Sequence, residues 1–153
     1  MIIGIDASNI RIGGGVTHLK ELLDNNNPRN FGLEKIIVFS GSNTLNQLKD
    51  QAWLIKITHP LINKSLFHII LWQKFYLNKM LLKYNCNLLF CPAGTYIGRF
   101  KPYIAMSQNM LIFEKKESSR YRFSLIRVRF FILNLVQSAS FKNANAVINY
   151  MDL

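Results

Sequence analysis

Short apolar runs recur along the chain and predict six strands. The first, Ile2–Asp6, is apolar at nearly every position rather than at every second one, which is typical of a strand buried on both faces. The others share this pattern and cover residues 35–40, 53–57, 87–91, 103–107 and 144–150. Polar and turn-forming residues separate these runs, as in Asp24-Asn25-Asn26-Asn27-Pro28.

Apolar residues at helical spacing predict helices between the strands. Val16, Leu19, Leu22 and Leu23 fall on one stripe of a first helix. A short helix is expected over residues 43–50, with Asn43 or Thr44 as its cap. Longer helices are expected over residues 66–84 and 119–141.

This alternation predicts the α/β class, as a Rossmann-like three-layer domain with a mostly parallel sheet of about six strands. The 153 residues have the length of one domain, and we expect residues 1–153 to form a single one. Ligands of such sheets bind beyond the carboxyl ends of the strands. The loops to inspect are therefore residues 7–15, 41–43, 58–64, 92–101 and 108–118.

Three consecutive glycines, Gly13, Gly14 and Gly15, lie between the first strand and the first helix. Bare backbone can approach a phosphate there, and the start of a helix adds amide donors. A flexible turn is the simpler alternative. The loop lacks G-x-G-x-x-G, the second strand ends at Ser40 without an acid for a ribose, and no Gly-Lys-Ser/Thr follows. The sequence therefore argues against a dinucleotide oxidoreductase and against a P-loop enzyme.

Basic residues are concentrated in the second part of the chain. Lys and Arg number 19 against 8 Asp and Glu, a net charge of +11. Residues 1–60 contribute six basic and five acidic side chains, whereas residues 61–153 contribute thirteen and three. This excess indicates an anionic partner, which is a phosphate-bearing substrate, a lipid surface or nucleic acid. The hydrophobic half of the composition excludes an intrinsically disordered chain.

Cysteines and histidines form no catalytic or metal-binding pattern. In an extended segment, Cys86 and Cys91 would face opposite sides of the sheet, and we expect reduced thiols in a cytosolic protein. No ligand spacing relates His18, His59 and His68, so no metal is expected. His18 lies off the apolar stripe of its helix, near the glycine loop, and is either a solvated residue or a neighbour of the ligand.

The sequence predicts no spanning helix, but it allows contact with a membrane surface. The chain starts without the basic segment of a signal peptide, and no stretch has the roughly 18 apolar residues of a spanning helix. The last predicted helix carries four arginines, Arg120, Arg122, Arg127 and Arg129. They fall on two nearly opposite faces of the helix, whereas a nucleic-acid interface would gather them on one face. We expect an interfacial membrane contact for this helix and for residues 66–84, or a buried helix with ordinary surface charge.

Three segments together resemble the retaining glycosyltransferases of family four, which have the two-domain GT-B fold. The first strand is followed by Ser8-Asn9 and by Gly13-Gly14-Gly15-Val16-Thr17-His18-Leu19. Residues 102–114, Pro-Tyr-Ile-Ala-Met-Ser-Gln-Asn-Met-Leu-Ile-Phe-Glu, are similar to a strand and loop of members from surface-polysaccharide gene clusters. Residues 143–148, Asn-Ala-Asn-Ala-Val-Ile, are similar to the strand that ends the first domain of these enzymes.

The resemblance implies a role on the acceptor side, because the N-terminal domain of that family binds the acceptor and the C-terminal domain binds the nucleotide-sugar. The glycine loop, Gly13 to Gly15, would approach the donor diphosphate across the cleft. The cleft itself would be lined by Thr17, His18, Gln108 and Asn109. Gln108 stands where many relatives have a histidine, so no catalytic residue is carried over.

The donor-binding domain of the family carries an E-x₇-E element, which this sequence lacks, and the chain ends at Leu153, where the crossover to that domain would begin. The expectation is therefore the acceptor-side half of an enzyme that moves a sugar from a nucleotide-sugar, its co-substrate, to a lipid-linked glycan or polysaccharide precursor. No cofactor is implied. The half would be inactive alone, in the cytoplasm or on the inner face of the cytoplasmic membrane, and would need a separate donor-binding chain.

Two other functions remain open at this point. One is a basic binding module for an anionic membrane or nucleic acid, although no known nucleic-acid fold is recognisable. The other is a decayed gene product. An incomplete enzyme would also leave apolar side chains of its last helix exposed, and we expect this of Phe130, Phe131 and Phe141.

Overall fold

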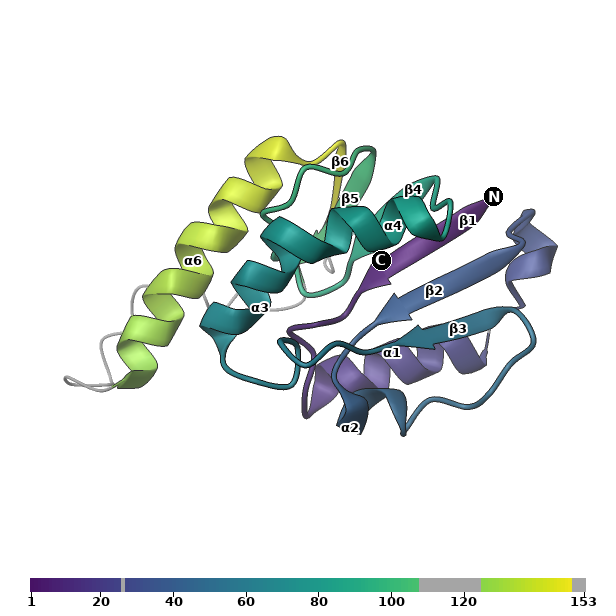
Figure 1. The fold of residues 1–153 in the computed structure, drawn as a ribbon, viewed down its shortest axis with the longest axis horizontal. Coiled ribbons are helices and arrows are strands. Elements are labelled where there is room, and N and C mark those ends of the chain that lie inside the picture. Colours follow the sequence, from purple (N-terminus) through teal and green to yellow (C-terminus); the bar gives the residue numbers. More distant parts are fainter. Residues whose placement is uncertain (26, 108–124, 150–153) are drawn as a thin grey trace.

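The computed structural model describes residues 1–25, 27–107 and 125–149. In this part of the chain, six strands form one sheet in the order β3-β2-β1-β4-β5-β6, and all neighbouring strands are parallel (Figure 1). The strands are β1 (Ile2–Asp6), β2 (Lys35–Phe39), β3 (Leu54–Ile57), β4 (Leu88–Cys91), β5 (Tyr103–Ser107) and β6 (Ala146–Asn149). The predicted Rossmann-like α/β fold is confirmed, with a sheet that is wholly parallel.

Helices cover both faces of this sheet (Figure 1). The first face carries α1 (Gly14–Asp24) and the one-turn α2 (Ser42–Leu45). The second face carries α3 (Leu66–Trp72), α4 (Asn78–Lys83) and α6 (Leu125–Asn143). A 3-10 turn, η1 (Pro28–Phe31), which the sequence pattern does not predict, connects α1 to β2.

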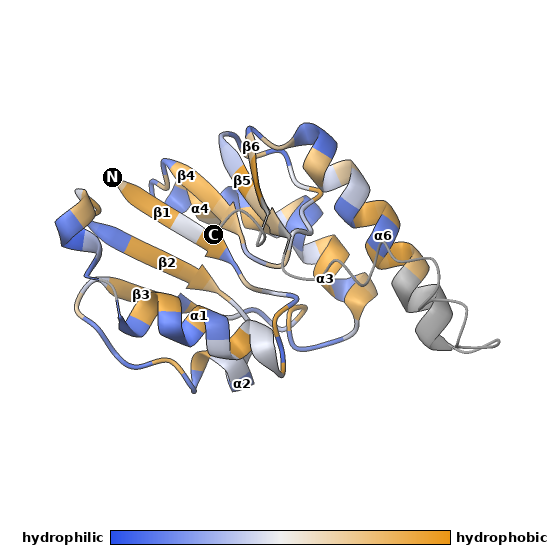
Figure 2. Ribbon diagram, turned by 180° about the vertical axis from the view of Figure 1, so that it is seen from behind, coloured by the Kyte–Doolittle hydropathy of each residue, from blue (hydrophilic) through white to orange (hydrophobic). Residues whose placement is uncertain are grey.

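Strands β1, β2 and β4 supply side chains to two cores, which explains why these strands are apolar at successive positions. On the first face, Val38 packs in one core with Leu19 of α1. On the second face, Phe39 packs with Trp72 of α3 and Leu89 of β4. Figure 2 shows the resulting hydropathy, with the central strands mainly hydrophobic.

The short second helix differs from its predicted form. It ends at Leu45 rather than at residue 50, and its N-cap is Gly41. Neither Asn43 nor Thr44 is the cap as predicted. The Thr44 hydroxyl instead donates a hydrogen bond to the Ile10 carbonyl (2.8 Å), so this side chain serves a loop contact and not the helix start.

The helix predicted over residues 66–84 forms one continuous run with a change of winding at its centre. Between α3 and α4 lies a π-helical turn, η2 (Gln73–Leu77). Such turns insert one extra residue into a helix and are frequent at functional sites. Here the turn carries Gln73, a polar residue that is almost fully buried.

The two cysteines do not face opposite sides of the sheet, so that prediction is wrong. Cys86 and Cys91 are free thiols in the same core on the second face. Cys86 precedes β4 and follows Asn85, which has a left-handed φ of 54°, so strand alternation does not apply to it. Burial raises the pKa of the Cys86 thiol to about 11.

Candidate functional site

The strand order of the sheet reverses between β1 and β4. The strands β2 and β3 follow β1 on one side of the sheet, and β5 and β6 follow β4 on the other side. In doubly wound sheets, ligands bind outside the carboxyl ends of the strands at this point. The segments that leave β1 and β4 there are residues 7–13 and 92–96.

A buried polar cluster lies directly beneath these two segments. Asp6, the last residue of β1, is only 2% exposed. Its Oδ1 accepts a hydrogen bond from the Ser8 amide (3.2 Å), and its Oδ2 accepts one from Gln73 Nε2 (2.6 Å). The same Gln73 nitrogen donates to the Thr95 carbonyl (2.9 Å). One amide group therefore joins the ends of β1 and β4 to the π turn.

Burial sets the charge state of Asp6. Removal from water raises the pKa of this carboxyl from 3.8 to about 6, although its hydrogen bonds with Ser8 and Gln73 act in the opposite direction. No ion pair with Asp6 is found among the residues that the structure describes. The side chain is too enclosed to contact a substrate, so its role is to position the two loops.

Side chains also fix the rest of the loop after β1. Ser40 Oγ donates to the Ala7 carbonyl (2.8 Å). The Asn9 amide donates to Thr95 Oγ1 (2.5 Å), which joins this loop to the one after β4. The Arg11 guanidinium donates to the carbonyls of Ile62 (2.9 Å) and Lys64 in the loop after β3. Residues 7–11 are thereby fixed at several points.

The glycine tip, residues 12–14, is by contrast open. Ile12 is 88% exposed, and a Cβ added at Gly13 or Gly14 would meet no atom within 4 Å. Gly13 is the N-cap of α1 with φ +75°, which favours glycine, and no side chain caps the helix. The first turn of α1 contains no acidic residue. An uncapped helix start of this kind can receive an anion on its amides.

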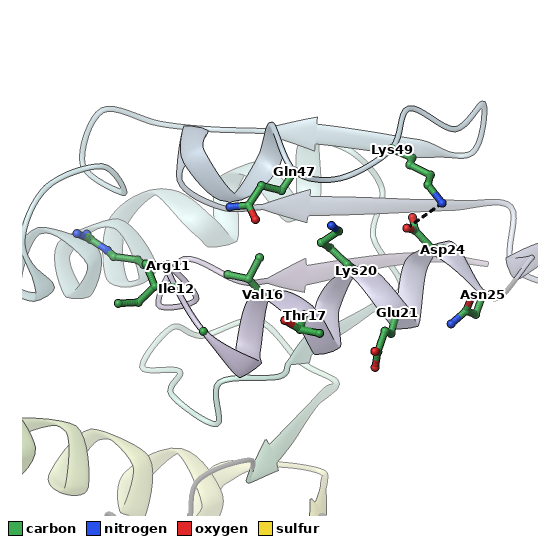
Figure 3. Close-up of a pocket in the computed structure, with 11 residues that line it drawn as sticks. Arg11, Ile12, Val16, Thr17, Lys20, Glu21, Asp24, Asn25, Gln47 and Lys49 are labelled. Carbon is green, nitrogen blue, oxygen red and sulfur yellow. Dashed lines mark ion pairs between the residues drawn. The ribbon is translucent and has the colours of Figure 1, made fainter.

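A groove of about 540 Å³ leads from this tip along the outer side of α1 (Figure 3). Gly13, Thr17 and Lys20 lie on its α1 side, and Gln47 and Lys49 lie across it. Lys49 pairs with Asp24 at 3.1 Å at the far end. Glu21 also lines the groove, so the groove carries acidic as well as basic side chains, with Thr17 closer to the glycines than the charged Lys20 and Glu21.

The structure joins some of the predicted site residues and not others. Gly13 and Thr17 line the groove together, whereas His18 is partly buried and is not among the lining residues. Gln108 and Asn109 lie outside the described residues, so their predicted place in a shared cleft with the glycine loop stays a prediction. β5, which precedes them, does end at the same edge of the sheet as β1.

Sequence reasoning missed the residues that hold the loops, above all Gln73, Thr95 and Asn9. One signal was available, because Gln73 is an uncharged polar residue within a largely apolar predicted helix. Its burial depends on the π turn, which hydrophobic periodicity does not reveal.

Metal chemistry finds no support in the described part of the chain, where no three His, Cys, Asp or Glu side chains come together to hold an ion. The arrangement at this edge can bind an anionic group on backbone amides and can keep the surrounding loops rigid.

Comparison of the chain with protein-family models, curated proteins and solved structures finds no match.

Proposed function

We propose that these 153 residues are the acceptor-side half of a glycosyltransferase, which moves a sugar from a nucleotide-sugar to a lipid-linked glycan or polysaccharide precursor. In this proposal the glycine tip contacts the donor diphosphate, and the cleft residues Thr17, His18, Gln108 and Asn109 receive the acceptor. The donor nucleotide is held by a second domain or chain.

One observation carries the proposal. The start of α1 is lined by glycine, has no side-chain cap and is exposed at the point where the strand order reverses. A diphosphate needs donors that are held in place before it binds. The fixed residues 7–11 supply such a base for the open tip, and the sequence resemblance assigns a diphosphate to it.

The first test compares sugar transfer by the chain alone and in the presence of a donor-binding domain. Purified chain is incubated with several nucleotide-sugars and a membrane extract as the source of acceptor. We expect no transfer from the chain alone, because a few amides cannot position a diphosphate against water. Robust turnover by the chain alone would refute the divided site.

The second test follows the glycine tip directly with inorganic pyrophosphate as the probe. In a nuclear magnetic resonance titration, shifts of backbone amides should gather at Gly13, Gly14 and Thr17. Gly14→Asp places a negative charge in open space and should abolish these shifts without unfolding the chain. Asn43→Asp, in the first turn of α2 at the same edge of the sheet, is the matched control and should retain them. Shifts scattered elsewhere would contradict the proposal.

A further inference from the structure

The helical run of residues 66–83 presents apolar side chains to the solvent as well as to the core. Phe67 is 65% exposed, Phe75 54% and Leu82 60%. Lys74 and Lys79 are also exposed, on the side of the run that faces away from the core. We call these exposed residues the docking face: Phe67, Lys74, Phe75, Lys79 and Leu82.

The core does not require this apolar surface. The opposite side of the same run is fully buried on the second face of the sheet, through Ile69, Trp72, Leu77 and Leu81. Exposed large apolar residues that gather on one element mark an interaction surface. The start of α3 is visibly hydrophobic in Figure 2.

Positive charge accompanies the apolar residues. Residues 61–107 contain six Lys or Arg and no Asp or Glu. Lys74 Nζ lies 5.6 Å from the centre of the Phe75 ring, and Lys83 Nζ lies 5.8 Å from that of Tyr84. Within the described residues, only Lys49 and Lys56 form ion pairs with carboxylates, so the lysines of this run have no carboxylate partner there.

The neighbouring helix adds exposed apolar residues on the same face of the sheet. Phe131 of α6 is 64% exposed and Leu135 is 56% exposed. This confirms the expectation for Phe131, whereas Phe141 is partly buried against the core and the side chain of Phe130 lies outside the described part. The side chains of the four arginines predicted on two faces of this helix also lie outside the described part, so that division stays a prediction.

We propose that the docking face binds the surface of an anionic lipid bilayer, with the helical run lying flat in the interface. Phenylalanine and leucine side chains enter the boundary between headgroups and acyl chains, and the lysines reach the lipid phosphates. In the described residues, no helix is long and apolar enough to cross a bilayer. The proposal does not depend on sugar transfer and can be tested without it.

A bilayer accounts for both components of the face. Nucleic acid would use the lysines but would leave exposed Leu82 and the unstacked apolar surface without a role. A second copy of the chain would bring the same lysines together, which costs free energy unless anions separate them. A surface that is anionic and partly apolar complements both the lysines and the apolar side chains of the docking face.

The test is sedimentation of the 153-residue chain with vesicles of phosphatidylglycerol and phosphatidylcholine, compared with vesicles of phosphatidylcholine alone. Binding should require the anionic lipid and should weaken with salt. The double variant Phe67→Ser/Phe75→Ser should reduce partitioning by about tenfold or more, because both rings leave water on binding. The separate double variant Lys74→Gln/Lys79→Gln should also reduce partitioning onto the anionic vesicles, most strongly at low salt.

Matched controls come from η1 and the first residue of β2, away from the docking face. Phe31→Ser removes a ring that is 70% exposed, and Arg29→Gln/Lys35→Gln removes two exposed charges. These variants should bind vesicles as the unchanged chain does. The indole added by Phe75→Trp should be quenched by brominated lipid, whereas the indole added by Phe31→Trp should not.

Three results would overturn the proposal. Equal losses in the docking-face and control variants would mean that vesicle binding is not localised to this face. Binding to oligonucleotides without binding to vesicles would identify a nucleic-acid surface. A dimer that Phe67→Ser/Phe75→Ser converts to monomer, again without vesicle binding, would identify an interface between copies.

Discussion

Asp6 is a carboxylate enclosed by the fold without a cation beside it in the described structure. The carboxylate accepts hydrogen bonds from the Ser8 amide and from the Gln73 side chain, and both donors are neutral. Hydrogen bonds alone only partly offset the cost of burying a charge. Asp6 therefore fixes two loops at the candidate site at some expense of stability near neutral pH.

This expense predicts a pH dependence. The Asp6 carboxyl has a pKa of about 6 in the fold against 3.8 in its ordinary environment, so over this range the native state holds a proton that the unfolded state has lost. The free energy of unfolding therefore falls by about 3 kcal/mol in total as the pH rises through this range, and it stays lower above it. Asp6→Asn removes this contribution.

Urea unfolding of both proteins at about pH 4.5 and about pH 7.5 is the measurement. The stability of Asp6→Asn relative to the unchanged chain should improve by about 2 kcal/mol between the two conditions. Parallel pH profiles would contradict the assignment.

Gly94, after β4, is a second residue whose identity is imposed by its surroundings. It has φ +68°, and an added Cβ would lie 2.7 Å from Gln137 Nε2 and 2.9 Å from the Met106 carbonyl oxygen. Gly94→Ala should lower the free energy of unfolding by about 3 kcal/mol, from backbone strain and overpacking together. Gly32→Ala is the control, since Gly32 has φ +71° with nothing within 4 Å, and should cost about 1 kcal/mol. Equal losses in thermal or urea unfolding would show that packing at Gly94 is unimportant.

At the scale of elements, the π turn is the feature that joins the helical run to the site. It keeps Leu77 and Leu81 in the core while Gln73 remains above Asp6. A regular helix over the same residues would not hold both in these directions, because one residue would be rotated out of register.

Gln73→Leu tests this connection. The variant keeps the side-chain volume but leaves the Asp6 carboxylate and the Thr95 carbonyl without their donor. We expect a loss of about 2–3 kcal/mol at about pH 7.5 and a smaller loss at about pH 4.5, where Asp6 is protonated. The double variant with Asp6→Asn should lose less than the sum of the single changes, and strict additivity would argue against a shared network.

Element types follow from local sequence, whereas the site depends on contacts between distant residues. Runs such as Ile2–Asp6 predict strands because burial on both faces leaves a direct apolar signature. The cap of α2 was not predictable in this way, since the Thr44 hydroxyl donates its hydrogen bond to the Ile10 carbonyl in a different loop. The same holds for Asn9 and Thr95, which are 86 residues apart and meet only because β1 and β4 are neighbours.

At the scale of the whole molecule, the central strands enclose both thiols. Cys86 and Cys91 lie in the core of the second face together with Leu81 and Leu89. Burial raises the pKa of each thiol, and the charge of Asp6 adds to the effect at Cys91. Both sulfurs should therefore be inert until the sheet opens.

Thiol labelling with a disulfide reagent measures this opening. In the native chain both cysteines should react more slowly than a free thiol by about a thousandfold or more, and at similar rates. Asn43→Cys introduces an exposed thiol as an internal control, which should react at once. Rapid labelling of Cys86 alone would indicate that α4 detaches from the sheet locally.

The contrast between the fixed residues 7–11 and the open tip at Ile12 to Gly14 has a consequence for how this chain can change over generations. Ala7, Asn9 and Arg11 hold or receive hydrogen bonds from other loops, so substitution there disturbs distant segments. Ile12 and Gly14 contact little, so a new side chain at either position alters what the tip can bind while the scaffold persists. Ligand preference at this edge can drift by single substitutions without a compensating change elsewhere.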